Sequence, residues 1–119
     1  MQPDSYHSLA KSLEAVGLTA QQQGPDQLVV SCQEGPVWPN RGNSFWLSRK
    51  EGAWYLSTWS PVGYGIPADQ DIVALCTACM SVENSAMCRV PSDLVSRFQL
   101  QELDDDAYER VFLSEVDYP

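Results

Sequence analysis

Two aromatic-rich runs separated by the dipeptide Glu-Gly at 51–52 constrain the fold of this chain more than any other feature. The runs are Ser-Phe-Trp-Leu-Ser-Arg-Lys at 44–50 and Ala-Trp-Tyr-Leu-Ser-Thr-Trp at 53–59. Aromatic and aliphatic residues on either side of a two-residue connection that contains glycine are typical of a β-hairpin. With residues 51–52 as the turn, Ser48 faces Tyr55 across the two strands.

This pairing divides the side chains of the hairpin between two faces, because successive residues of a strand point in opposite directions. One face carries large residues suited to a core, namely Phe45, Leu47, Trp54 and Leu56. The other face alternates aromatic residues with serine and carries Trp46, Ser48, Tyr55, Ser57 and Trp59. Rigidly held indole and phenol rings make good contact residues, and serine between them suits a half-wet surface.

We therefore predict a partner-binding patch on the second face of the hairpin. It consists of Trp46, Tyr55 and Trp59, extended by Trp38 and Tyr64 from flanking loops. The competing interpretation is that the terminal helices cover this face, in which case the rings belong to the core of the protein.

Hydrophobic periodicity and turn residues predict the remaining elements. Helices are expected over residues 5–20, from Asp69 or Asp71 to about 82, from about 90 to 98, and over 103–116, with a strand over 27–33 and loops over 34–43 and 60–68. This order predicts one α+β domain over residues 1–119. Its sheet is a three-stranded antiparallel meander, with a fourth strand near 86–90 as an option, an N-terminal helix and two to three C-terminal helices.

The charge of the chain excludes several classes of partner. Acidic residues outnumber basic residues 16 to 7, which gives a formal charge of −9. Nucleic-acid phosphates and anionic membrane surfaces both require clustered Lys and Arg, so neither is an expected partner. No apolar run is long enough for a membrane span, and no export signal is visible, so we expect a cytoplasmic protein. An acidic field favours capture of another protein, with a basic one as an option.

The chain has four cysteines, of which Cys76 and Cys79 form a C-x-x-C pair. A structural zinc site completed by Cys32 and Cys88 is one interpretation of this spacing. However, Cys76 and Cys79 fall on the apolar face of the predicted helix, where free cysteine packs as a small hydrophobic side chain. We predict core cysteines, no metal and no cofactor, and we keep zinc binding and a redox or disulfide role as alternatives.

Catalytic signatures are weak throughout the sequence. The only histidine, His7, falls on the first predicted helix, and no Gly-x-Ser-x-Gly motif or phosphate-binding glycine loop is present. The acidic run Asp104–Asp106 lacks the ligand pattern of a calcium loop and predicts a capped helix start with a solvated acidic face. A docking site for a basic partner and a weak cation site are alternatives for this run.

The sequence as a whole predicts a small acidic protein that is not an enzyme and that binds another protein through the patch defined above. Its order of helix, meander and helices is similar in architecture to bacterial immunity proteins and secretion chaperones, with no shared motif. The first alternative is a small-ligand or enzyme site lined by the same five aromatic residues and closed by loops 34–43 and 60–68. The second alternative is the zinc site. The oligomeric state does not follow from the sequence.

Overall fold

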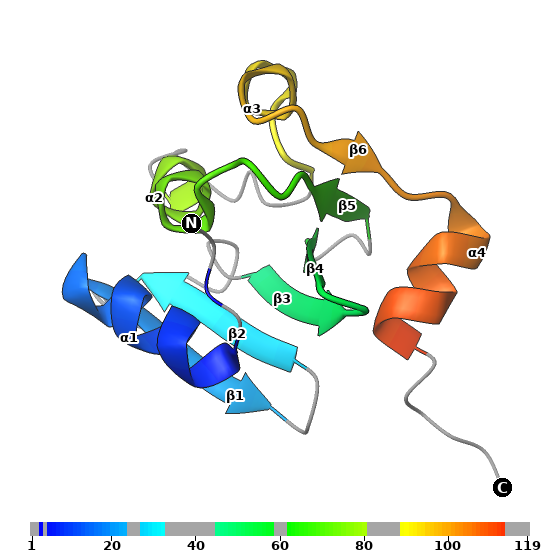
Figure 1. Ribbon diagram of the computed structural model, residues 1–119. Coiled ribbons are helices and arrows are strands. Elements are labelled where there is room, and N and C mark those ends of the chain that lie inside the picture. Colours follow the sequence, from blue (N-terminus) through cyan, green and yellow to red (C-terminus); the bar gives the residue numbers. More distant parts are fainter. Residues whose placement is uncertain are drawn as a thin grey trace, which may run out of the picture.

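The computed structural model describes residues 3, 5–23, 27–32, 45–58, 62–80 and 89–113. They form an α+β structure with an antiparallel sheet in which every strand pairs with its neighbours along the chain, in the order β1-β2-β3-β4-β5-β6 (Figure 1). The strands are β1 (Leu18–Gln23), β2 (Gln27–Cys32), β3 (Phe45–Lys50), β4 (Ala53–Ser57), β5 (Gly63–Ile66) and β6 (Gln101–Glu102). The α+β class is confirmed, but the sheet has six strands rather than three or four.

Helices lie on both sides of this sheet. They are α1 (Tyr6–Ala15), α2 (Ile72–Met80), α3 (Ser92–Arg97), α4 (Asp105–Tyr108) and the π-helical turn η3 (Glu109–Leu113). Figure 1 shows α1 and α2 together on one side of the molecule and α4 on the other. Within the described ranges, no helix has the length and apolar character that crossing a bilayer requires.

The β3–β4 hairpin has the predicted register, with Leu47 opposite Leu56 and Ser48 opposite Tyr55. Both turn residues have positive φ, 52° at Glu51 and 80° at Gly52. Such a turn matches the right-handed twist of the strands, and glycine adopts this conformation without a steric penalty. The two faces of the hairpin are therefore those that the sequence predicts.

The first helix is shorter than predicted, because the chain turns at Gly17 and continues as a strand. The backbone of Gly17 has a φ of 92°, which ends α1 just after Ala15 and reverses the chain direction. Residues 18–20, which were expected to end this helix, pair with β2 together with residues 21–23. In this pairing Ala20 lies opposite Val30. The predicted strand over 27–33 is confirmed as β2.

The loop prediction for residues 60–68 is wrong for Gly63–Ile66, which form β5. In this strand Tyr64 lies opposite Leu56 and Ile66 lies opposite Trp54, so its large side chains join the core face of the hairpin. Two glycines in a run of four residues lower its strand propensity, and packing on both sides overrides that local preference.

The helices predicted for the second half of the chain agree in outline with the structure. Helices α2 and α3 lie where the sequence places them, and Asp104 caps α4 by accepting a hydrogen bond from the Ala107 N–H at 2.8 Å. The predicted loop over 34–43 and residues 86–88 of the optional fourth strand fall outside the described residues, and Arg89 and Val90 belong to no strand.

The main core lies between one face of the sheet and helices α1, α2 and α3. Its largest side chain, that of Trp54, is completely buried and donates its indole N–H to the Pro3 carbonyl at 2.9 Å. The other fully buried large side chains of this core are Tyr64, Phe45, Leu9, Leu13, Leu28, Leu47, Leu56, Ile72, Leu75 and Val30. On the opposite face, Val111 and Phe112 of η3 are each only 4% exposed.

Two glycines of β5, on this opposite face, predict contrasting effects of adding a single methyl group. A Cβ atom at Gly63 would lie 2.8 Å from the ring of Tyr108 and 3.0 Å from Leu103. At Gly65 its nearest neighbour would be the Tyr55 ring at 3.7 Å, an ordinary contact distance. We expect Gly63→Ala to lower the free energy of unfolding by about 1–3 kcal/mol because of overpacking.

The matched control is Gly65→Ala, which changes the same residue type in the same strand and on the same face. We expect it to leave the free energy of unfolding within about 0.5 kcal/mol of the wild-type value. Urea denaturation followed by tryptophan fluorescence measures both variants. Equal destabilisation by the two substitutions would contradict the close packing of α4 and η3 over Gly63.

Candidate functional site

The sheet face that carries Trp46 and Tyr55 is partly covered by α4 and η3. The hydroxyls of Ser57 and Tyr108 lie 2.8 Å apart and share a hydrogen bond, which fastens α4 to the sheet. Ser57 is 3% exposed and Ser48 is completely buried. The prediction that these serines belong to a half-wet surface is therefore wrong. They supply small polar side chains beneath a helix.

The five predicted contact residues do not form one patch. Trp46 and Tyr55 share the predicted face and are both half-buried. Tyr64 was expected in a loop beside them, but it lies in β5 on the opposite face and is 1% exposed. Trp38 and Trp59 lie outside the described residues. The structure therefore brings together two of the five and separates the third from them.

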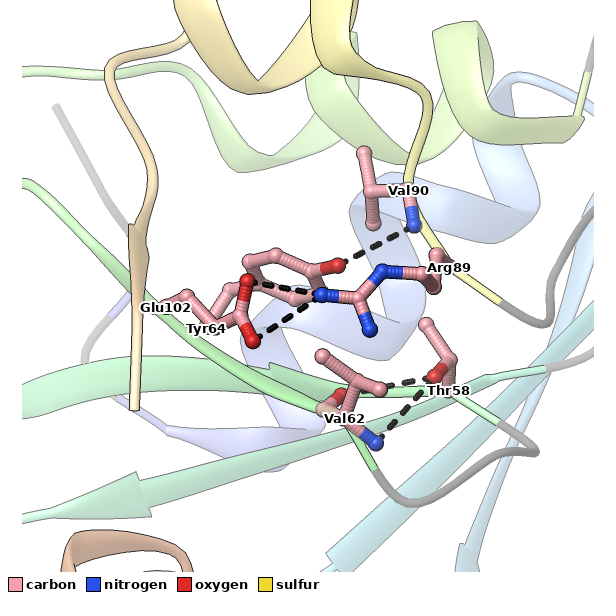
Figure 2. Close-up of polar contacts among 6 residues, drawn as sticks. All are labelled: Thr58, Val62, Tyr64, Arg89, Val90 and Glu102. Atoms are coloured by element: carbon pink, nitrogen blue, oxygen red, sulfur yellow. Dashed lines mark hydrogen bonds and ion pairs between the residues drawn. The ribbon is translucent and has the colours of Figure 1, made fainter. Parts of the chain in front are cut away.

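Tyr64 instead anchors the segment that leads into α3 (Figure 2). Its hydroxyl accepts a hydrogen bond from the Val90 N–H at 3.3 Å, and burial raises the pKa of this phenol. Next to the ring, the Arg89 guanidinium contacts both carboxylate oxygens of Glu102 at 3.0 Å. The Tyr64 bond joins the segment before α3 to β5, and the Arg89–Glu102 pair joins it to β6, so Tyr64 takes part in packing of the fold.

Beside Tyr55, the uncovered part of the same face forms a hollow of about 460 Å³ (the Tyr55 hollow). Its base contains the small residues Ala53 and Gly65, and the Tyr55 ring forms one wall. The opposite wall comes from the entry into α4, where Asp104 and Ala107 line the hollow. Because Gly65 has no side chain, the space above β5 stays open next to an aromatic ring.

The two sides of Tyr55 differ in charge. On the side of the Tyr55 hollow, three consecutive aspartates begin α4, and all three are exposed. On the other side, a smaller hollow of about 220 Å³ is lined by Tyr55 together with Lys50, Glu51, Arg110 and Val111. The larger hollow is thus lined by the acidic residues Glu102 and Asp104, whereas the smaller one has a lining of mixed charge.

Sequence reasoning found Tyr55 and the aspartate run separately but did not place them together. The hollow depends on β5 and β6, neither of which was predicted. The two glycines of Gly63-Tyr64-Gly65 were a usable signal, because glycine inside a strand often marks a close approach of another group.

The cysteines that the structure describes pack as apolar side chains, as predicted. Cys76 is completely buried and Cys79 is 1% exposed, both on the inner face of α2. Burial raises the pKa of Cys76 well above its ordinary value and that of Cys79 to about 12. Metal binding and nucleophilic attack both require the thiolate, which burial disfavours here. The side chain of Cys32 and all of Cys88 lie outside the described residues.

Among the described side chains, no group of three or more His, Cys, Asp or Glu residues is arranged to hold a metal ion. His7 is exposed on α1. Comparison with protein-family models, curated proteins and solved structures finds no significant match to this chain. Its function is therefore argued from the geometry of the site.

The raised pKa values of the α2 thiols predict a loss of stability at alkaline pH. The unfolded chain releases the Cys79 proton near the ordinary pKa of 9.0, whereas the folded chain retains it until about pH 12. Above pH 9 the folded state binds more protons, so the free energy of unfolding falls as the pH rises toward 12. Each retained proton contributes about 1.4 kcal/mol per pH unit to this slope.

Replacing the thiol removes its share of the pH dependence. We expect Cys79→Ala to flatten the fall in stability between pH 9 and 12. Thr77→Ala, at an exposed position of the same helix, should keep the wild-type slope. Urea denaturation at a series of pH values measures the slope. An unchanged slope in Cys79→Ala would show that the folded protein does not hold this proton.

The hydrogen bond between Ser57 and Tyr108 predicts a measurable coupling between the sheet and α4. We expect Tyr108→Phe and Ser57→Ala each to lower the free energy of unfolding by about 1 kcal/mol. Because both substitutions remove the same bond, the double variant should lose less than the sum of the two single effects. Strictly additive losses in urea denaturation would mean that α4 is not fastened at this point.

Proposed function

We propose that this protein is a binding module without catalytic activity that captures a basic segment of a partner protein in the Tyr55 hollow. The observation that supports this proposal is an open hollow lined by Tyr55 and by the acidic residues Glu102 and Asp104, with two more exposed aspartates directly after Asp104. A lysine or arginine side chain entering this space would meet the phenol ring and the carboxylates together.

Both contacts favour a cation. The negative face of an aromatic ring attracts an ammonium or guanidinium group that lies within about 6 Å of the ring centre. The carboxylates at the start of α4 add a charge–charge attraction, and Asp104 keeps a fixed orientation because it caps the helix. Arginine suits such a site better than lysine, since its planar guanidinium stacks on the ring and pairs with a carboxylate.

The charge of the molecule supports the same partner class at longer range. A net charge of −9 steers a basic protein toward the surface and raises its association rate at low salt. The smaller hollow on the other side of Tyr55 has two basic residues, Lys50 and Arg110, and one acidic residue, Glu51, so it attracts a cation less than the Tyr55 hollow does. Recognition thus has both a general and a local component.

The two alternatives have less support. A ligand site lined by all five predicted aromatic residues needs Tyr64 on the same face as Tyr55, whereas β5 directs it into the main core. A zinc site needs accessible thiolates, whereas Cys76 and Cys79 are buried with raised pKa values, and no metal-binding group of side chains occurs among the described residues. We therefore propose the protein-binding function.

The test uses a short fluorescent peptide of alternating arginine and glycine, compared with the same peptide carrying citrulline, a neutral analogue of arginine. Fluorescence anisotropy measures the affinity. We expect binding of the arginine peptide alone, and about a tenfold loss of affinity in Tyr55→Ala, which removes the ring. Tyr55→Phe keeps the ring and should stay close to the wild-type affinity.

A charge-matched pair of variants separates a local site from general attraction. Asp105→Asn with Asp106→Asn removes two exposed carboxylates that directly follow Asp104 of the hollow. Glu14→Gln with Asp93→Asn removes two exposed carboxylates at other positions and gives the same net charge. We expect only the first pair to weaken binding substantially. Equal weakening by both pairs, or binding of the citrulline peptide, would reject the proposed site.

A further inference from the structure

Strand β1 forms one end of the sheet, and no described strand pairs with its outer side. Figure 1 shows β1 beside β2 at this end, with α1 lying over its face. In an edge strand, alternate residues direct their backbone N–H and C=O groups away from the sheet, where they form a template for another strand. This edge is a separate feature from the Tyr55 hollow, which lies over β4 and β5.

β1 lacks the features by which proteins usually protect a sheet edge. Its sequence Leu-Thr-Ala-Gln-Gln-Gln contains no proline and no charged residue. All six residues pair with β2 in uninterrupted register, so no bulge bends the strand. The other edge strand, β6, contrasts with it, because β6 has two residues, one of which is the charged Glu102.

Strand β1 itself carries no charged residue, although the molecule is strongly acidic. In the described ranges 5–23 and 27–32, the charged residues are one lysine, Lys11, and one glutamate, Glu14. The C-terminal range 101–113 instead contains five acidic residues and one arginine. Two copies that pair through β1 therefore bring no charged side chain of that strand together, whereas pairing through β6 would place Glu102 of both copies at the interface.

We propose that a second copy of this chain pairs with the first through β1, antiparallel and around a two-fold axis perpendicular to the sheet. Such an interface is self-complementary and joins the two sheets into one. Around such an axis, one residue of β1 lies opposite the same residue of the second copy. One allowed register gives this position to Gln21. The glutamine amide both donates and accepts hydrogen bonds, so identical side chains satisfy each other there.

A second feature of the surface supports this choice of occupant. Val16 is the large hydrophobic residue that the described surface exposes, at 50%, and it comes two residues before β1. An exposed apolar side chain close in sequence to an uncharged strand suits a neutral partner surface. It suits less well the basic segment that we propose for the Tyr55 hollow. Pairing through β1 leaves both hollows of the dimer accessible, because they lie toward the other end of each sheet.

Sedimentation equilibrium from low-micromolar to near-millimolar concentration tests the proposal. We expect the wild-type chain to form a dimer in this range, and Gln21→Lys to raise the dimer dissociation constant by about tenfold or more, because two like charges meet on the axis. Ser96→Lys, at an exposed position of α3, adds the same charge elsewhere and should leave the constant unchanged. Thermal denaturation of dilute samples checks that both variants fold.

Amide hydrogen exchange locates the interface. We expect protection of residues 18–23 to rise with protein concentration in the wild type and not in Gln21→Lys. A wild-type chain that stays monomeric throughout, or a dimer that Gln21→Lys and Ser96→Lys weaken equally, would overturn the proposal. So would concentration-dependent protection at α4 in place of β1. The peptide-binding variants of Tyr55 should leave the dimer unchanged, which separates the two proposals.

Discussion

The register of the β3–β4 hairpin determines which side chains face the core and which face α4. The Glu51-Gly52 turn places Leu47 opposite Leu56, and this pairing sends Trp54 into the main core and Tyr55 to the other face. A slip of one residue would exchange the two faces completely. Strands β2 and β5 then follow the same alternation, with Leu28 against Leu47 and Tyr64 against Leu56.

Two glycines of β5 give the second face its shape. Gly63 has no side chain, so the ring of Tyr108 lies close to the backbone and α4 seats firmly on the sheet. Gly65, two residues later on the same face, has only ordinary contacts above it and borders the Tyr55 hollow. Glycine thus allows a helix to pack closely at Gly63 and leaves open space at Gly65. The boundary between covered and open surface falls between them.

The sequence predicted the parts of the fold that local patterns specify. The hairpin and its register follow from a turn signal between two alternating runs, and the Asp104 cap follows from its place before a helical pattern. β1 and β5 escaped prediction because their local signals conflict with their structure. Val16 and Ala20 continue the helical spacing of the first helix although Gly17 turns the chain between them, and two glycines weaken the strand signal of β5.

The candidate site was only partly predictable for a related reason. Alternation along β4 placed Tyr55 on the correct face, but the identity of its neighbours depends on strands far away in the sequence. Tyr64 was assigned to the same patch because a loop leaves its direction undetermined, whereas a strand fixes it. Asp104 lies about fifty residues beyond Tyr55, and only the pairing of β5 with β6 brings α4 to the hollow.

The uneven distribution of charge along the sheet gives the molecule a permanent electric dipole. At one end of the sheet strand β1 carries no charge, and at the other end the described segment from β6 through η3 carries five acidic residues and one arginine. In the field of an approaching cationic surface, such a body rotates before it makes contact, so its aspartate-rich pole arrives first. Diffusional encounters of a single chain are then biased in orientation as well as in frequency.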